Sequence, residues 1–79
     1  MIIQFYTTLG CHLCEQAAQL LGELQQTSHP GLVVESVDIA LDQVLFDQYG
    51  IRIPVVKREE LTQDLGWPFT RSELAAYLE

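Results

Sequence analysis

Basic residues are scarce in this chain. Four lysines and arginines stand against eleven acidic residues, which gives a formal net charge of −7 over 79 residues. Nucleic acids and anionic membrane surfaces are bound through clustered lysine and arginine, so we expect neither as a partner. Long apolar runs are also absent, and none approaches the length of about 20 residues that spans a bilayer. The start, Met1-Ile2-Ile3, lacks the basic residues of a signal peptide, and the sequence therefore predicts a cytoplasmic protein.

Metal-ligating residues are few as well. The chain has two cysteines and two histidines, whereas a structural zinc site takes about four protein ligands and a catalytic site about three. His12 is next to Cys11 in sequence, and His29 lies at the far end of the helix predicted below. We therefore predict no metal site in a single chain. An iron–sulfur cluster shared by two chains, with two thiolates from each, stays open as an alternative.

The remaining composition is that of a single folded domain over residues 1–79. Hydrophobic residues make up 48 % of the chain, and no repeat, linker or low-complexity segment interrupts it. A chain of this length has a small core, enough for one sheet layer and a few helices. Periodicity and breaker residues predict strands at 2–6, 32–38, 55–57 and 61–65, helices at 11–26 and 41–49, and a last helix from a capping box at 70–73 through 78.

The order of these elements predicts the fold. The first strand is apolar on both faces, as a central strand would be. The first two strands and the helix between them should form a right-handed βαβ unit with parallel strands. The connection between the last two strands is too short for anything except an antiparallel hairpin. We predict an α/β fold of β-α-β-α-β-β-α order, the thioredoxin fold in minimal form, with a mixed four-stranded sheet flanked by helices on both faces. From the periodicity of apolar residues we assign six side chains to its core: Leu20, Leu21, Leu24, Val33, Val37 and Leu45.

The motif Cys11-His12-Leu13-Cys14 follows the first strand and opens the first helix. Two thiols three positions apart on the first turn can join as a disulfide and separate again. The unpaired N–H groups and positive dipole end of a helix start favour a thiolate at Cys11, so we assign Cys11 as the nucleophile and Cys14 as the resolving thiol. A protonated His12 would stabilise that thiolate further, or His12 is simply solvated. The alternatives for the pair are a permanent bridge or two buried apolar side chains.

Other residues are candidates for substrate contact. Pro54 lacks an N–H, so the Ile53 backbone could pair with an extended substrate beside the cysteines. We assign Ile53 and Pro54, with His12 and Leu13, to substrate binding. Tyr6 and Leu9 are further candidates for the edge of the site, although Tyr6 could instead belong to the core. Arg52 could offer its charge to a substrate carboxylate or could simply be solvated. Trp67 and Phe69 could form a binding patch, but we favour a place in the core for both.

The chain resembles the glutaredoxin-like members of the thioredoxin superfamily over nearly its whole length. The most specific elements are Thr8-Leu9-Gly10-Cys11-His12-Leu13-Cys14 and Ile53-Pro54. The resemblance implies reduction of disulfides, or of mixed disulfides with glutathione, without a bound organic cofactor. It also implies that Pro54 is cis and faces the cysteine pair. The chain departs from that family with His-Leu between the cysteines, with Arg52 before Ile53-Pro54, and with residues 65–70 in place of the Gly-Gly turn that contacts glutathione.

These observations predict a cytoplasmic, monomeric, glutaredoxin-like thiol–disulfide oxidoreductase that uses Cys11 and Cys14. Its partners would be disulfide-bearing proteins or small thiols, with glutathione, thioredoxin or a reductase as the upstream electron donor. Two alternatives remain. One is a non-catalytic adaptor module of thioredoxin fold, and the other is a carrier of a metal or an iron–sulfur cluster.

Overall fold

The computed structural model describes all residues, Met1–Glu79. Its elements, in chain order, are β1 (Ile2–Thr7), α1 (His12–Gln26), β2 (Val33–Asp38), the short 3-10 helix η1 (Ile39–Leu41), α2 (Gln43–Tyr49), β3 (Val55–Arg58), β4 (Asp64–Gly66) and α3 (Arg71–Tyr77). The predicted element order is confirmed. The 3-10 helix η1 was not predicted from the sequence, and the predicted strand at 61–65 is wrong in its start, because β4 begins only at Asp64.

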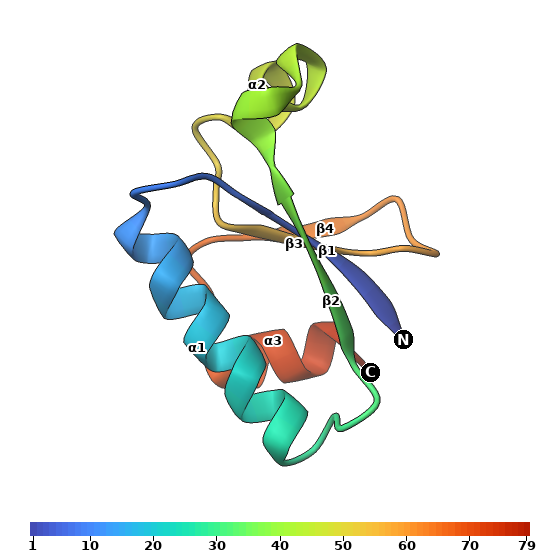
Figure 1. Cartoon of the computed structure of the whole chain (residues 1–79). Helices are drawn as coiled ribbons and strands as arrows, with labels where there is room; N and C mark the ends of the chain where they lie inside the picture. Colours follow the sequence, from blue (N-terminus) through green and yellow to red (C-terminus); the bar gives the residue numbers. More distant parts are fainter.

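The sheet is mixed and four-stranded, with the strand order β2-β1-β3-β4 (Figure 1). The first strand is central, as its apolar composition predicted. It pairs in parallel with β2 and antiparallel with β3, while β3 and β4 form an antiparallel hairpin. This topology brings the C-terminal end of β1 beside the N-terminal end of β3, since Tyr6 lies opposite Val55.

The two faces of the sheet are covered unequally. Ile3 and Phe5 of β1 join the larger core cluster, which α1 and α3 complete on one face. Tyr6 and Val55 point to the other face, where a smaller cluster contains Ile39 and Tyr49 of the η1–α2 segment. In Figure 1 α1 and α3 lie together on one side, and α2 stands at the far end of the sheet. Helices therefore flank both faces, but α2 covers only one end of the second.

The core predictions follow this uneven cover. Leu21 and Leu24 of α1 are buried, and Leu20, Val37 and Leu45 are partly buried against the two clusters. Val33 was predicted to be core, which is wrong, because its side chain is 51 % exposed. It pairs with Ile2 at the end of the sheet that α2 does not reach.

The aromatic residues after β4 belong to the core, as predicted. Phe69 is 4 % exposed within the larger cluster, and Trp67 packs against that cluster partly buried. The two rings meet edge to face with centroids 5.1 Å apart. The capping box predicted at the start of α3 is present, with Thr70 and Glu73 each accepting from the other's backbone N–H.

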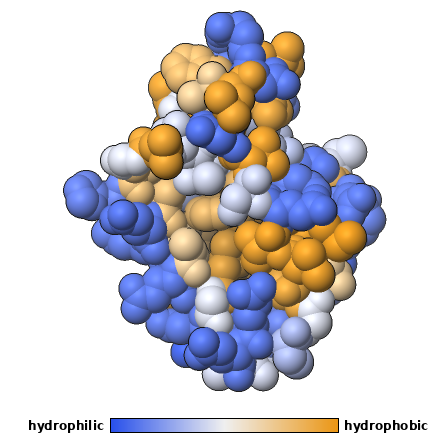
Figure 2. All heavy atoms as spheres, viewed as in Figure 1, coloured by the Kyte–Doolittle hydropathy of each residue, from blue (hydrophilic) through white to orange (hydrophobic).

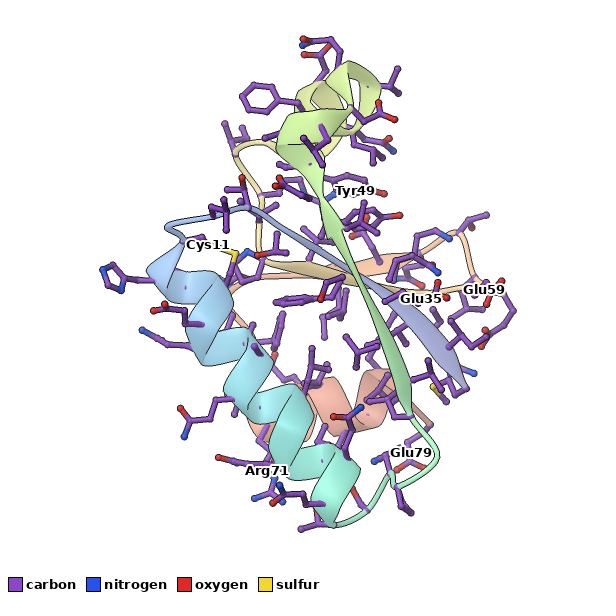
Figure 3. All side chains as sticks on the ribbon, in the orientation of Figure 1. Cys11, Glu35, Tyr49, Glu59, Arg71 and Glu79 are labelled. Carbon is purple, nitrogen blue, oxygen red and sulfur yellow. A yellow bond between two sulfur atoms is a disulfide. The ribbon has the colours of Figure 1, made fainter.

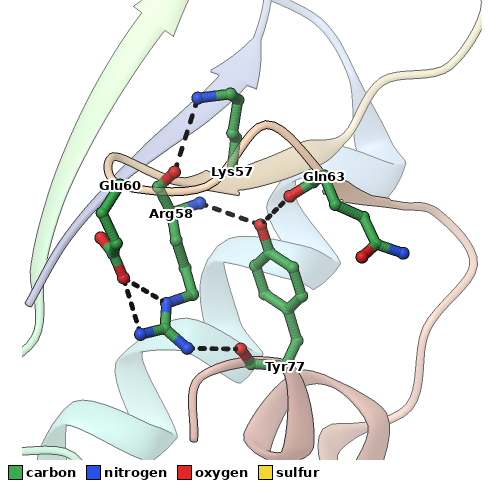
Figure 4. A network of polar contacts seen from close by, with 5 residues as sticks. All are labelled: Lys57, Arg58, Glu60, Gln63 and Tyr77. Carbon is green, nitrogen blue, oxygen red and sulfur yellow. Dashed lines mark hydrogen bonds and ion pairs between the residues drawn. The ribbon is translucent and has the colours of Figure 1, made fainter.

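A polar network fixes the β3–β4 hairpin to α3 (Figure 4). The Tyr77 hydroxyl accepts from the Arg58 N–H at 2.9 Å and donates to the Gln63 carbonyl oxygen. The Arg58 guanidinium pairs with Glu60 at 2.6 Å and donates to the Tyr77 carbonyl oxygen at 3.3 Å. Partial burial raises the pKa of Tyr77, because the ionised phenolate would lose solvation. The Tyr77 hydroxyl thus bridges Arg58 and Gln63, which would be the next pair of the hairpin ladder, and β4 begins one residue later, at Asp64.

None of the helices has the length and apolar content required to cross a membrane.

Candidate functional site

A tight turn connects β1 to α1. Gly10 has φ of 78°, in the left-handed region that strains any residue with a Cβ atom. No atom lies within 4 Å of where a Cβ would stand, so the backbone conformation alone requires glycine here. Cys11 follows as the N-cap of α1 with extended φ and ψ of −93° and 104°. The turn therefore sets Cys11 at the helix start, where backbone N–H groups are unpaired.

The two cysteines lie together at this helix start. Their sulfur atoms are close enough to form a disulfide, and their Cα atoms are 5.2 Å apart, within the usual range of about 4.4–6.8 Å. The Cys14 N–H donates to Cys11 Sγ at 3.1 Å. Cys11 is partly buried, whereas Cys14 is only 4 % exposed. A disulfide-bearing partner can therefore reach Cys11 more readily than Cys14.

The two residues between the cysteines face solvent. The His12 side chain is 93 % exposed and its Nδ1 lies 3.3 Å from Oε2 of Glu15, one turn along the helix. Leu13 is 44 % exposed. Both residues lie on the outer side of the first turn of α1, beside the cysteine pair, and their roles in substrate binding stay predictions.

Ile53 and Pro54 lie at the same end of the sheet as the cysteines, because β3 begins at Val55, opposite Tyr6 near the end of β1. The peptide bond between them is cis, and Pro54 is buried directly before β3. Ile53 packs against both core clusters, and Cys11 packs against the larger one. Figure 3 shows Cys11 at the first turn of α1, and β1, the strand that leads to this turn, ends beside the start of β3. The structure thus brings the two predicted parts of the site to one end of the sheet.

The backbone pairing predicted for Ile53 needs a correction. Its N–H already donates to the Tyr49 carbonyl oxygen at 3.1 Å, which closes the turn after α2. The Pro54 carbonyl oxygen is also engaged, by the Trp67 N–H at 3.0 Å. An extended substrate could therefore use only the Ile53 carbonyl oxygen, which accepts no hydrogen bond in the structure.

An open pocket of about 240 Å³ adjoins the cysteines, lined by the end of β1, the turn after it and one face of α1. Cys11, Cys14 and Glu15 contribute to its wall, and Leu9, which is 92 % exposed, stands at its edge. Leu9 therefore lies where it was predicted. Tyr6 does not line the pocket and is a core residue, buried and stacked on Tyr49 with ring centroids 4.2 Å apart. Glu15 was not singled out from the sequence, although it lies four positions after Cys11 on the same helix face.

Arg52 is not free to meet a substrate carboxylate. Its Nη2 and Nη1 atoms bind Oδ1 and Oδ2 of Asp64 at 2.6 and 3.1 Å, and its guanidinium lies over the Tyr49 ring, 5.8 Å from the centroid. Hydrogen bonding to Asp64 raises the pKa of Arg52 above its ordinary value. A Cβ at Gly66 would come within 3.2 Å of Nη2, so Gly66 leaves room for the guanidinium over β4. Asp64 is distant in sequence, and nothing in the sequence pointed to this pair.

No set of three or more histidine, cysteine or acidic side chains is arranged to hold a metal ion.

Comparisons with known proteins agree with this fold. The family described as Glutaredoxin-like domain (DUF836) matches residues 2–79. The crystal structure of target protein XcR50 from X. campestris is 34 % identical, with a TM-score of 0.81, over 96 % of this chain and 93 % of that one. Its solution structure is 35 % identical over 99 % and 92 %, with a TM-score of 0.78.

A more distant structure shares only the fold. Thioredoxin O2 from Arabidopsis thaliana in its oxidized state is 14 % identical, with a TM-score of 0.69, over 98 % of this chain and 70 % of that one. No curated protein matches the chain.

Proposed function

Because this chain belongs to the Glutaredoxin-like (DUF836) family, we propose that it is a thiol–disulfide oxidoreductase that works through Cys11 and Cys14. One observation supports the proposal above the others. The two sulfur atoms are close enough to form a disulfide at the start of α1, and Cys11 Sγ already accepts a backbone N–H there. A sulfur in that position is stabilised as an anion, which is the form that attacks disulfides.

The reaction has two exchanges. The Cys11 thiolate attacks one sulfur of a substrate disulfide, forming a mixed disulfide and releasing the other substrate sulfur as a thiolate that takes up a proton. Cys14 then loses its proton and attacks Cys11 Sγ, which releases the second substrate thiol and forms the Cys11–Cys14 disulfide. The substrate gains two electrons and two protons, and the protein loses them. The greater burial of Cys14 supports the second step as its role.

The oxidised pair must be reduced again by a thiol donor, for which glutathione, thioredoxin or a reductase are the classes we propose. Substrates would be disulfide-bearing proteins or small disulfides that approach Cys11 from the pocket and Ile53 side. Both cysteines belong to one chain, so a single chain suffices for the exchange, and we propose a monomer. A cytoplasmic location suits a protein that must be returned to its dithiol form, because that compartment keeps thiols reduced.

The proposal is tested by the reduction potential of the pair. The protein is equilibrated in glutathione buffers of graded ratio, alkylated and analysed by mass. We expect one two-electron transition, with a midpoint of about −200 to −270 mV, the range from glutaredoxins to thioredoxin. A Cys14→Ser variant should accumulate a mixed disulfide at Cys11, and Cys11→Ser should react with no disulfide. If no intramolecular disulfide forms at any poise, the oxidoreductase proposal is wrong.

A further inference from the structure

The pocket beside the cysteines carries negative charge. The Glu15 side chain lines it next to Cys11 and Cys14 and is 77 % exposed, so its carboxylate is open to an incoming molecule. Thr8 also lines the pocket, and its hydroxyl donates to Oδ1 of Asp38 at 3.1 Å. Two carboxylates therefore lie at or just behind the pocket wall. His12 is the histidine beside Glu15, with its Nδ1 atom 3.3 Å from Oε2 of that carboxylate.

No free cation balances these carboxylates. Lys57 and Arg58 lie opposite Gln4 and Ile3, toward the N-terminal end of β1 and away from the cysteines. Arg71 pairs with the second half of α1, at the far end of that helix from Cys11 (Figure 3).

Arg52 is the only basic residue near the cysteine end, and it is engaged elsewhere. Its guanidinium runs back along β4 over Gly66 to Asp64, the first residue of β4, which lies opposite Lys57 at the turn end of the β3–β4 hairpin. A bidentate pair of this kind holds the guanidinium in a fixed orientation, directed at one carboxylate. The charge that could have received an anionic substrate is therefore neutralised.

We propose that the site selects disulfides by charge, with Glu15 in the cysteine pocket receiving a cationic group next to the substrate disulfide and disfavouring anionic disulfides such as that of glutathione. The inference rests on the proposed thiol–disulfide exchange and names its substrate class. The matching substrate is a disulfide flanked by an amine, or by lysine or arginine in a protein. The chemistry is the same two-electron exchange, in which the protein dithiol becomes the Cys11–Cys14 disulfide and the substrate becomes two thiols.

The test is a single-turnover measurement on the pre-reduced full chain. Second-order rate constants are measured for oxidation by cystamine, which is dicationic, by hydroxyethyl disulfide, which is neutral, and by glutathione disulfide, which is anionic. The buffer is at pH 8, above the range in which histidines usually carry a proton, and at low ionic strength. The variant is Glu15→Gln, and the matched control is Glu59→Gln, an exposed carboxylate at the other end of the molecule (Figure 3).

We expect Glu15→Gln to slow oxidation by cystamine about two- to five-fold, the range of one exposed ion pair. Relative to the rate with the neutral disulfide, it should speed oxidation by glutathione disulfide by a similar factor. The neutral disulfide reports any change in the reactivity of Cys11 itself. In 1 M salt, where screening acts beyond about 3 Å, the differences should vanish. Glu59→Gln should alter none of the three rates.

Two results would overturn the inference, and they differ in meaning. If Glu15→Gln changes all three rates by one common factor, or changes none, Glu15 does not select by charge and the redox proposal still stands. If the pre-reduced protein is oxidised by none of the three disulfides, the proposed function itself fails.

Discussion

The Arg52–Asp64 pair should make a measurable contribution to stability. It is bidentate, with contacts of 2.6 and 3.1 Å, and the side chains are 43 % and 19 % exposed. Exposed pairs are worth about 0.2–1 kcal/mol, and this geometry places the pair at the upper end of that range. Removing the guanidinium also removes its contact with the Tyr49 ring, which contributes about 0.5–1 kcal/mol.

A double-mutant cycle separates these terms. We expect Arg52→Met to lower the free energy of unfolding by about 1–2 kcal/mol and Asp64→Asn by about 1 kcal/mol, with a coupling energy near 1 kcal/mol. For a domain of this size, each kcal/mol lowers the melting temperature by about 4–8 °C. Urea unfolding of the four proteins at low and high salt gives the coupling directly, and salt should reduce it only in part because Asp64 is mostly covered.

The chain offers a matched control for this cycle. Arg71 and Glu23 form a single contact of 3.6 Å, with side chains 49 % and 41 % exposed. A cycle on that pair, Arg71→Met with Glu23→Gln, should give a coupling below about 0.3 kcal/mol. If the coupling energy of Arg52–Asp64 is no larger than that of Arg71–Glu23, Asp64 does not hold the Arg52 guanidinium in place. Arg52 would then be available to an anionic substrate near the cysteines.

Two further predictions concern the hairpin and the turn before Cys11. Tyr77→Phe removes hydrogen bonds to Arg58 and Gln63 and should lower the free energy of unfolding by about 1–3 kcal/mol. Burial raises the pKa of Tyr77, so its contribution to the free energy of unfolding is complete below about pH 10 and is lost as pH rises through the raised pKa. If Tyr77→Phe unfolds at alkaline pH as the unchanged protein does, this reasoning is wrong. Gly10→Ala should cost about 1–2 kcal/mol because φ is 78°, whereas Gly22→Ala inside α1 should stabilise by about 0.5–1 kcal/mol; equal effects in urea unfolding would refute the backbone argument.

Exposed apolar side chains gather on the η1–α2 segment, and Figure 2 shows this at the end of the molecule where α2 stands. Leu41 is 86 % exposed, Val44 71 % and Phe46 52 %. The helical spacing of residues 41–49 was sufficient to predict a helix but not to show how little of it is covered. A short helix at the end of a sheet buries only the side chains that reach the sheet, which here are Leu45 and Tyr49.

Local sequence determined most of the fold. Apolar residues on both faces identified β1 as a central strand, and the breakers around residues 27–31 and 50–54 separated the elements correctly. The capping box placed the start of α3 at Thr70. These signals act between neighbours in the chain, so they can be read without the structure. The Cys-x-x-Cys spacing likewise located the candidate site, because a first helical turn brings residues three apart together.

Contacts between residues distant in sequence were decided only by the tertiary structure. The sequence could not show that Arg52 is bound by Asp64, that the Ile53 N–H is taken by Tyr49, or that Tyr77 binds the β3–β4 hairpin. Each of these depends on which side chain the folded sheet places within hydrogen-bonding distance, and a pattern of residue types does not encode that distance. Chain-local geometry therefore determined where the cysteines stand, and long-range packing determined the charge that surrounds them.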